Sequence, residues 1–501
     1  DPIYAPIVDI LGNARPNPAG SNPDLGAYEH ELAVTFYPAV VENLTATPLH
    51  RSVQLEWDYH KEEDVASYIT YMSEDSSIAF TAVDTVVGRF STSTTIDSLV
   101  NGTDYWFYVT AVDTADYESS PTLHVKTSPF FQGPVWIVDA DNGTSNGEGS
   151  PEEPLKYIRD AIEESADGDT IMLMPGTYDH SKNRNLNFQD SYDGTGVRNL
   201  TLMGKYGADT TFIDLDGNDF IDFIGNEDNS SKISGLTIQN SASGAVDIWN
   251  ASPEIENCIF LNNQNNQNGG AINIQGTNGD VVSISNTLFD GNSIQDGSFQ
   301  RGGAIHIGND DSKAFVENCI FYNNSADEMG GGINQDNNSN LVIVQSLFLN
   351  NTTNANWGAG GVNSFAAEYG GNTTIINSIF AGNANALGST ESDVYSSNGY
   401  PIDVDHCILQ STNSATFNYG ENFAFEPLIN DTTNGDFSLN EFSNAIGLGT
   451  DEYYNPILDD DGLVPETDFL GNARPGSGGG KPDIGAIEHE RWEQRRKVFY
   501  L

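Results

Sequence analysis

The sequence repeats one short motif at intervals of 27 to 32 residues, in which an asparagine follows a phenylalanine by three positions. The phenylalanines are Phe260, Phe289, Phe321, Phe348 and Phe380. The asparagines are Asn263, Asn292, Asn324, Asn351 and Asn383. Glycine-rich segments between the copies begin at Gly269, Gly302, Gly330 and Gly358. Repeats of this length indicate a solenoid in which each copy forms one coil.

Stacking of coils explains why the same residue types recur. Successive coils lie about 4.8 Å apart, so equivalent positions form ladders of Phe and of Asn along the axis. Asparagine amides bond to neighbouring side chains and to the backbone of turns. The glycines admit positive φ angles or close backbone approach. About 290 residues of coil at about 26 per turn predict about 11 coils.

Two resemblances follow from these patterns. The GGAINI, GGAIHI and FxxN segments resemble the repeats of polymorphic outer-membrane proteins, which are β-helical adhesins of bacterial surfaces. Residues 134–178, with an apolar helical stripe before the strand TIMLM, resemble the N-terminal cap of pectate-lyase-like right-handed β-helices. The resemblance implies an all-β chain in which residues 129–490 form a right-handed parallel β-helix.

A second repeat spans almost the whole chain. Residues 9–31 and 468–490 align without a gap, so that Arg15, Asp24 and Glu29 correspond to Arg474, Asp483 and Glu488. We interpret residues 1–31 as the closing segment of a preceding β-helix and residues 468–490 as the closing motif of this one. The motif resembles the end of β-helix domains in the "choice-of-anchor" class of bacterial surface proteins.

The closing motif has a structural interpretation. Arg474 with Asp483 or Glu488 is expected to form a hydrogen-bonded ion pair that caps the last coil. The basic tail, residues 491–501, is either an electrostatic plug for an acidic partner or a frayed terminus.

Residues 32–128 show strands with alternating apolar residues. PAVVENLTATP, Trp57, Tyr68 and LVNGTDYWFYVTAVD resemble a fibronectin type III domain, with Tyr105 in the place of its tyrosine corner. We expect a spacer, with carbohydrate binding through exposed aromatic residues as the alternative.

Charge and cysteine content exclude several classes of function. The chain has 20 Lys and Arg against 72 Asp and Glu, giving a formal charge of -52. Such a surface argues against nucleic acid and anionic membranes as partners. No apolar run is long enough for a transmembrane segment. Cys258, Cys319 and Cys407 are expected to be buried free thiols, two coils or more apart.

The sequence gives no catalytic residue that stands out. A polysaccharide lyase needs a basic cleft. Arg301 and Lys313 are the only basic residues between Lys232 and Arg474 in the sequence, so we do not expect a lyase. A glycoside hydrolase needs only paired carboxylates, so this class stays open. No cofactor is expected. Calcium binding is an alternative to solvated turns at the following aspartates: Asp310, Asp311, Asp459, Asp460 and Asp461.

The function that the sequence favours is structural. We expect an extracellular protein at a bacterial cell surface, forming a stalk, fibre or matrix component or acting as an adhesin. Its expected partners are copies of itself, neighbouring repeat units, surface glycans or other cell surfaces. The alternative is a secreted polysaccharide-active enzyme or glycan-binding module.

Overall fold

A computed structural model provides the fold. It describes residues 7–15, 28, 37–189, 196–277, 279–294, 300–308, 311–336, 338–356, 358–366, 370–386, 392–396, 400–410, 421–457, 460–475 and 480–489. The chain divides into two compact units, residues 1–132 and 133–501, which are described separately. This division lies four residues after the domain boundary expected from the sequence.

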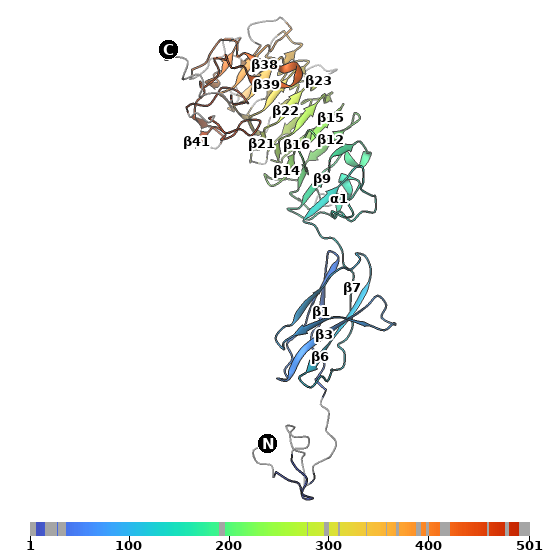
Figure 1. Ribbon diagram of the computed structural model, residues 1–501. Helices are drawn as coiled ribbons and strands as arrows, with labels where there is room; N and C mark the ends of the chain where they lie inside the picture. Colours follow the sequence, from blue (N-terminus) through green and yellow to red (C-terminus); the bar gives the residue numbers. More distant parts are fainter. Residues whose placement is uncertain are drawn as a thin grey trace. The chain divides into compact units, whose positions relative to one another are not determined.

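The first unit contains an antiparallel β-sandwich (Figure 1). One sheet is formed by β1 (Thr45–Leu49), β2 (Ser52–Glu56) and β5 (Ser93–Ile96). The other is formed by β4 (Thr81–Val87), β3 (Val65–Ser73), β6 (Tyr105–Asp113) and β7 (Val125–Thr127). In its core the rings of Trp57 and Tyr68 lie 5.3 Å apart. The hydroxyl of Tyr105 accepts a hydrogen bond from the backbone N–H of Val100, 3.1 Å away, as a tyrosine corner requires.

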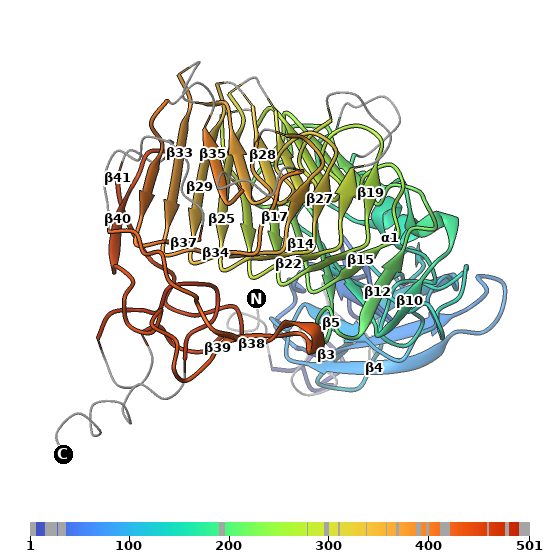
Figure 2. The same ribbon diagram turned by 90° about the horizontal axis from the view of Figure 1, so that it is seen from above.

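The second unit is a parallel β-helix whose described residues form three long sheets of ten, nine and seven strands. The ten-stranded sheet comprises β8 (Val135–Val138), β9 (Thr170–Leu173), β11 (Thr201–Gly204), β14 (Lys232–Ser234), β17 (Glu254–Glu256), β21 (Val282–Ser285), β25 (Lys313–Glu317), β29 (Asn340–Val344), β33 (Asn372–Ile376) and β36 (Asp403–Asp405). Figure 2 shows several of these strands side by side, from β14 to β33.

The other sheets follow the same order along the axis. The nine-stranded sheet comprises β10 (Gly176–Tyr178), β12 (Thr211–Asp214), β15 (Thr237–Gln239), β18 (Ile259–Leu261), β22 (Leu288–Asp290), β26 (Ile320–Tyr322), β30 (Leu347–Leu349), β34 (Ile379–Ala381) and β37 (Ile408–Leu409). The seven-stranded sheet comprises β13 (Ile221–Phe223), β16 (Val246–Trp249), β20 (Ile272–Gln275), β24 (Ile305–Ile307), β28 (Ile333–Gln335), β32 (Val362–Ser364) and β35 (Val394–Ser396). A small sheet comprises β19 (Gln264–Asn265), β23 (Ser293–Ile294), β27 (Ser325–Ala326) and β31 (Thr352–Thr353).

The helical stripe expected before the first coils forms a short helix, α1 (Ile158–Glu164). Its side chains Ile158, Ala161 and Ile162 are buried, as the stripe predicts. The one-turn helix η1 (Ser181–Asn183) follows β10.

Left-handed residues set the corner between the ten-stranded and nine-stranded sheets. We call this corner row the αL corner; its members are Asn257, Asn286, Asn318, Gln345, Asn377 and His406, with φ between 47° and 54°. Asparagine is enriched in this conformation because its short polar side chain bonds locally. Two residues after each corner residue the chain enters a short strand, so each Phe occupies the same place in its coil.

The phenylalanines stack inside the coils. Successive rings from Phe260 to Phe380 have centroids 5.1, 4.8, 4.5 and 4.6 Å apart. Their planes differ by 3 to 5°. All five side chains are fully buried.

The asparagines form a continuous amide ladder beside the rings. The Nδ2 of Asn292 donates to the Oδ1 of Asn324 (3.0 Å) in the next coil and to the carbonyl of Phe260 (2.9 Å) in the previous one. The same pattern recurs at Asn263, Asn324 and Asn351. At the last asparagine, Asn383, the Nδ2 donates to the carboxylate of Asp393 (3.0 Å) instead.

The expected number of coils was too high. The longest sheet of the described residues has ten strands. Coils average more than about 26 residues in the phenylalanine region, and the described residues between 421 and 489 add no strand to the three long sheets. They contain β38 (Ile429–Asp431), η4 (Thr432–Asn434), β39 (Asp436–Leu439), β40 (Glu452–Asn455) and β41 (Asp460–Leu463), which run along the outside of the coils (Figure 2).

This external segment buries the outer face of the later strands of the nine-stranded sheet, from β26 to β37. Residues on either side of the stacked phenylalanines, such as Ile320, Leu347 and Ile379, pack against Phe437 and Ile484. The β-helix therefore has an apolar core inside the coils and this outer core outside them. A second outer cluster contains Val342, Val344, Ile376 and Tyr453.

The amide ladder generates a test. In Asn351→Ala, the Nδ2 and backbone N–H of Asn324, the Oδ1 of Asn383 and the carbonyl of Phe321 lose a buried partner. Each such loss costs about 1–3 kcal/mol. We expect the free energy of unfolding of the β-helix, measured in urea, to fall by at least about 3 kcal/mol.

The matched control is Asn354→Ala, because this exposed asparagine makes one surface side-chain bond, to Asp327. It should change the free energy of unfolding by no more than about 0.5 kcal/mol. Equal effects of the two substitutions would show that the ladder does not contribute specifically.

Candidate functional site

A row of polar residues runs across the outer face of the seven-stranded sheet. In β13, Ile221 and Phe223 are buried in the core and Asp222 points the other way. Asp222 lies in register with Asp247 of β16, which lies in register with Asn273 of β20. Strand alternation and parallel register therefore place two carboxylates and an amide side by side.

The environment of this row raises the pKa of both carboxyl groups. Burial raises the pKa of Asp222 to about 6, with contributions from Asp247 and Asp219. Burial also raises the pKa of Asp247, against the effect of the hydrogen bond that its Oδ1 accepts from the Nδ2 of Asn273 (2.9 Å). Two neighbouring, partly buried carboxyl groups thus retain a proton more readily than surface aspartates.

An exposed tryptophan lies beside the pair. Trp249 is two residues beyond Asp247 in β16, so it points to the same outer face, and it is 50% exposed. It is in register with Gln275, whose Nε2 donates to the Oδ1 of Asn273 (3.2 Å). The row thus combines an aromatic surface with amides and carboxyl groups.

The chemistry open to this arrangement is acid–base catalysis or sugar binding. Neighbouring parallel strands are about 4.8 Å apart. Carboxyl groups about 5–5.5 Å apart are typical of retaining glycosidases, in which one is nucleophile and the other acid and base. An indole face offers a flat apolar surface to a ring-shaped ligand.

The same row becomes buried in later coils. His306, Asn334 and Asn363 continue it through β24, β28 and β32, and all three are buried. Burial lowers the pKa of His306 to about 4, so its imidazole is neutral near pH 7. This part of the row is a packed polar network rather than an open surface.

Arg301 covers this buried part. Its guanidinium contacts Asp336 (2.9 Å) and Glu328 (3.3 Å) and lies over the ring of Phe365. Both carboxylates neutralise the cation, so the guanidinium is not set up to bind a uronate.

Sequence reasoning missed the pair Asp222 and Asp247. A signal was present, because the first four strands of this sheet each carry a polar residue between two apolar ones, in IDF, VDI, INI and IHI. In a chain with 72 acidic residues, no single aspartate stood out.

The ladder residues selected from the sequence lie inside the coils. Phe260, Phe289, Phe321, Phe348 and Phe380 are fully buried, and the five asparagines are buried as well. They shape the scaffold and cannot contact a ligand in this state. The three cysteines are also buried and free, and burial raises the pKa of the Cys258 thiol to about 12.

The closing motif forms an ion pair in its second copy. Nη1 of Arg474 lies 3.2 Å from the Oε2 of Glu488, and both side chains are nearly inaccessible. Asp483 accepts hydrogen bonds from the backbone N–H groups of Gly447 and His489. Burial, followed by the nearby Glu488, raises the pKa of Asp483.

The location of the motif corrects our expectation. It does not cap the last coil alone. Arg474 donates to the side chains of Asn318 (3.2 Å) and Gln345 (3.0 Å), which belong to earlier coils at the αL corner. The chain reverses after the coils, so the motif reaches back along their flank. In the first copy, Arg15 is described, whereas Asp24 and Glu29 lie outside the described residues.

The aspartates considered for calcium are only partly described. Asp310 and Asp459 lie outside the described residues, as do the side chains of Asp460 and Asp461. Asp311 is exposed and accepts a hydrogen bond from Asn338 (2.6 Å). Within the described part of the chain, no group of three His, Cys, Asp or Glu could hold a metal ion.

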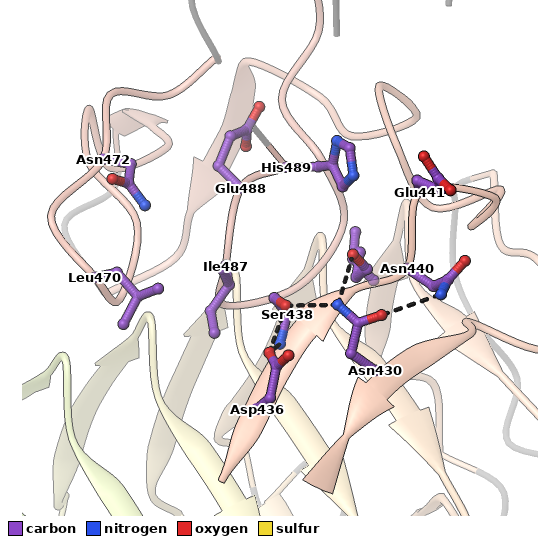
Figure 3. A pocket seen from close by; sticks show the side chains of 11 residues that line it. Asn430, Asp436, Ser438, Asn440, Glu441, Leu470, Asn472, Ile487, Glu488 and His489 are labelled. Carbon is purple, nitrogen blue, oxygen red and sulfur yellow. Dashed lines mark hydrogen bonds between the residues drawn. The ribbon is translucent and has the colours of Figure 1, made fainter. Parts of the chain in front are cut away.

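A pocket of about 420 Å³ lies beside the closing motif (Figure 3). Its side chains bond to each other: the Nδ2 of Asn430 donates to the hydroxyl of Ser438 (2.9 Å), and the Nδ2 of Asn440 donates to the Oδ1 of Asn430 (3.0 Å). Leu470, Ile487 and Glu488 line the opposite part of the pocket (Figure 3). These mutual bonds leave Asp222 and Asp247 as the stronger candidate for chemistry.

No described helix is long and apolar enough to cross a membrane.

The raised pKa of Asp222 predicts a pH-dependent stability. The folded protein holds this proton up to about pH 6, whereas an ordinary aspartate has a pKa of 3.8. The stabilisation by this group is therefore complete below about pH 4 and is lost as pH rises through about 6. We expect Asp222→Asn to match the wild type at pH 4 and to exceed its free energy of unfolding by about 1–2 kcal/mol at pH 8, after discounting for partial exposure.

Urea unfolding at several pH values measures this difference. Asp280→Asn, at an exposed aspartate, is the matched control and should show no such trend. If Asp222→Asn raised the free energy of unfolding equally at pH 4 and pH 8, the result would contradict the raised pKa.

Comparison with known proteins agrees with the fold. The family model described as "Right handed beta helix region" matches residues 223–399. No curated protein matches the chain in sequence.

Among solved structures, an Fn3-like protein from Clostridium thermocellum is 22% identical over 19% of this chain and 95% of its own, with a TM-score of 0.17. The spore cortex lytic enzyme SleM from Clostridium perfringens is 21% identical over 18% of this chain, with a TM-score of 0.16, and the chain spans 28% of that structure. A β-1,2-glucanase from Parabacteroides distasonis is 25% identical over 19% of this chain and 14% of its own, with a TM-score of 0.16. The expected fold class is confirmed: the chain is all-β, with a right-handed parallel β-helix and an N-terminal antiparallel sandwich in which Tyr105 forms the expected tyrosine corner.

Proposed function

We propose that this chain is an extracellular structural or adhesive repeat module of a bacterial cell surface. The observation that carries the proposal is the unbroken internal ladder. Five phenylalanine rings and five asparagine amides continue from coil to coil without a gap. A column held together at each step by parallel strands and buried amides is suited to act as a rigid spacer.

The surface charge supports an extracellular role. A formal charge of -52 keeps such a module hydrated and separate from other acidic molecules. The sandwich adds a second compact unit of the kind that serves as a spacer. The partners we propose are copies of the chain, neighbouring repeat units, and glycans or other cell surfaces.

Imaging tests this proposal. Antibodies against the purified chain, detected by gold labelling on cells that produce it, should mark the outer surface, appendages or matrix. The structural role fails if the label is found only in the culture medium, without association with cells. Pre-immune serum is the control.

A second candidate is supported by the pair Asp222 and Asp247 next to the exposed Trp249. We propose, as the alternative to a purely structural module, that this face binds a polysaccharide. If the chain is an enzyme, this face hydrolyses the bound polysaccharide. The carboxyl groups would supply the acid and the nucleophile, and the indole would hold a sugar ring. This proposal involves no metal ion.

Two measurements on insoluble polysaccharides separate the alternatives. If the face binds glycans without hydrolysis, Trp249→Ala should weaken co-sedimentation at least about tenfold, corresponding to the loss of about 1.4 kcal/mol, and no reducing ends should appear. Asp222→Asn should then bind about as well as the wild type. Release of reducing ends that Asp222→Asn abolishes would show an enzyme instead. Unchanged binding by Trp249→Ala would exclude this face as the site.

A further inference from the structure

Two segments at opposite ends of the chain fold into the same loop. We call residues 7–15 the N-terminal hook and residues 466–474 the C-terminal hook; each is offset from the other by 459 positions. In the N-terminal hook, the Oδ1 of Asp9 accepts from the backbone N–H of Leu11 and of Asn13, each at 2.8 Å. In the C-terminal hook, the Oδ1 of Asp468 accepts from Leu470 (2.9 Å) and Asn472 (2.7 Å).

The correspondence extends to the rest of the loop. The Nδ2 of the asparagine donates to the Oδ2 of the aspartate in both copies, at 2.9 and 3.1 Å. Gly12 and Gly471 have φ angles of 88° and 82°. The backbone N–H of Arg15 bonds to Ile7, and that of Arg474 bonds to Glu466. The two hooks therefore have the same backbone conformation and the same internal hydrogen bonds.

The C-terminal hook shows what this shape binds. The Nδ2 of Asn318 at the αL corner donates to the carbonyl of Thr467 (2.8 Å), and the Nη2 of Arg474 donates to the Oδ1 of Asn318 (3.2 Å). Gln345, one coil further, accepts from Arg474 as well. The hook therefore forms hydrogen bonds with side chains of two successive coils at the αL corner.

Apolar contact completes the docking. Phe469 packs against the outer core of the β-helix, and its N–H bonds to the carbonyl of Ala486 (2.8 Å). Leu470, at the tip of the loop, is 62% exposed. One side of the hook is thus covered and the tip is not.

The N-terminal hook has the same tip, but the apolar side chain that corresponds to the docked phenylalanine is exposed. Leu11, the counterpart of Leu470, is 71% exposed, similar to the docked copy. Ile10, the counterpart of the packed Phe469, is 69% exposed. The difference between the copies therefore lies on the side by which the C-terminal hook docks.

We propose that the N-terminal hook is a docking element for the αL corner of a second β-helix, one that precedes this unit in the same polypeptide. The αL corner of the β-helix described here is already occupied by the C-terminal hook. Arg15 would bind the amide side chains of the preceding β-helix that correspond to Asn318 and Gln345, as Arg474 does here. Ile10 would pack against the outer core of that β-helix, as Phe469 does here. In a tandem array, each hook would fix the sandwich that follows it to the β-helix before it.

An exchange within the full chain tests this proposal. Residues 466–490 are replaced by the sequence of residues 7–31, which has the same length. If the two hooks bind the same surface, the melting temperature of the β-helix should stay within about 2 °C of the wild type. Amide hydrogen exchange around Asn318, Gln345 and Asn377 should keep its protection.

Two controls define the undocked state. A chain with a Gly/Ser segment of equal length in place of residues 466–490 should lose at least about 5 °C and the protection at the αL corner. Arg15→Ala within the exchanged segment should lose protection at Asn318 and Gln345 in the same way. The proposal is overturned if the exchanged chain behaves like the Gly/Ser chain, or if Arg15→Ala within it has no effect.

Discussion

The β-helix depends on parallel stacking in register, because the same residue of each coil must lie directly above its counterpart. A shift by one position would turn the phenylalanines outward and break every bond of the amide ladder. The αL corner prevents this shift by fixing where each short strand begins. The residue two places before Phe is small in every coil, as Cys258, Thr287, Cys319, Ser346 and Ser378 show. The ladder and the corner therefore stabilise one register together, and coil length varies only in the loops between them.

Side chains that face into the coils and side chains that face outward have different roles in this scaffold. Inward-facing side chains, such as Phe321 and Asn324, hold the coils together and are inaccessible. Outward-facing side chains are free to differ from sheet to sheet. On the later strands of the nine-stranded sheet they are apolar and pack against the external segment, as Leu347 does. On the first strands of the seven-stranded sheet they include the half-buried Asp222 and Asp247 and the exposed Trp249. A structural module and a polysaccharide site are thus compatible on one chain, because they use different faces.

The closing motif shows how a buried charge is tolerated on this scaffold. Burial lowers the pKa of Arg474, while Glu488, Asp468 and Asp483 favour its charged form. Its guanidinium also bonds to the carbonyls of Gly485 and Ala486. An arginine in such a setting is oriented by its fixed donors and distinguishes its docking surface from other apolar surfaces. This property makes the motif suitable for repeated use in one polypeptide.

The sequence by itself determined the local and periodic features. The intervals from Phe260 to Phe380 predict the ladder, the stripe around Ile158 predicts the cap, and the segment around Tyr105 predicts the tyrosine corner. Each of these features depends on residues that are close in sequence or repeated at a regular distance. Only the tertiary structure decided that Asp222 meets Asp247, because the loop between them sets which residues become neighbours. It also decided that Arg474 meets Gln345 and Asn318, which are 129 and 156 residues away. Such contacts depend on where the chain reverses after its last coil, and no periodic pattern encodes that point.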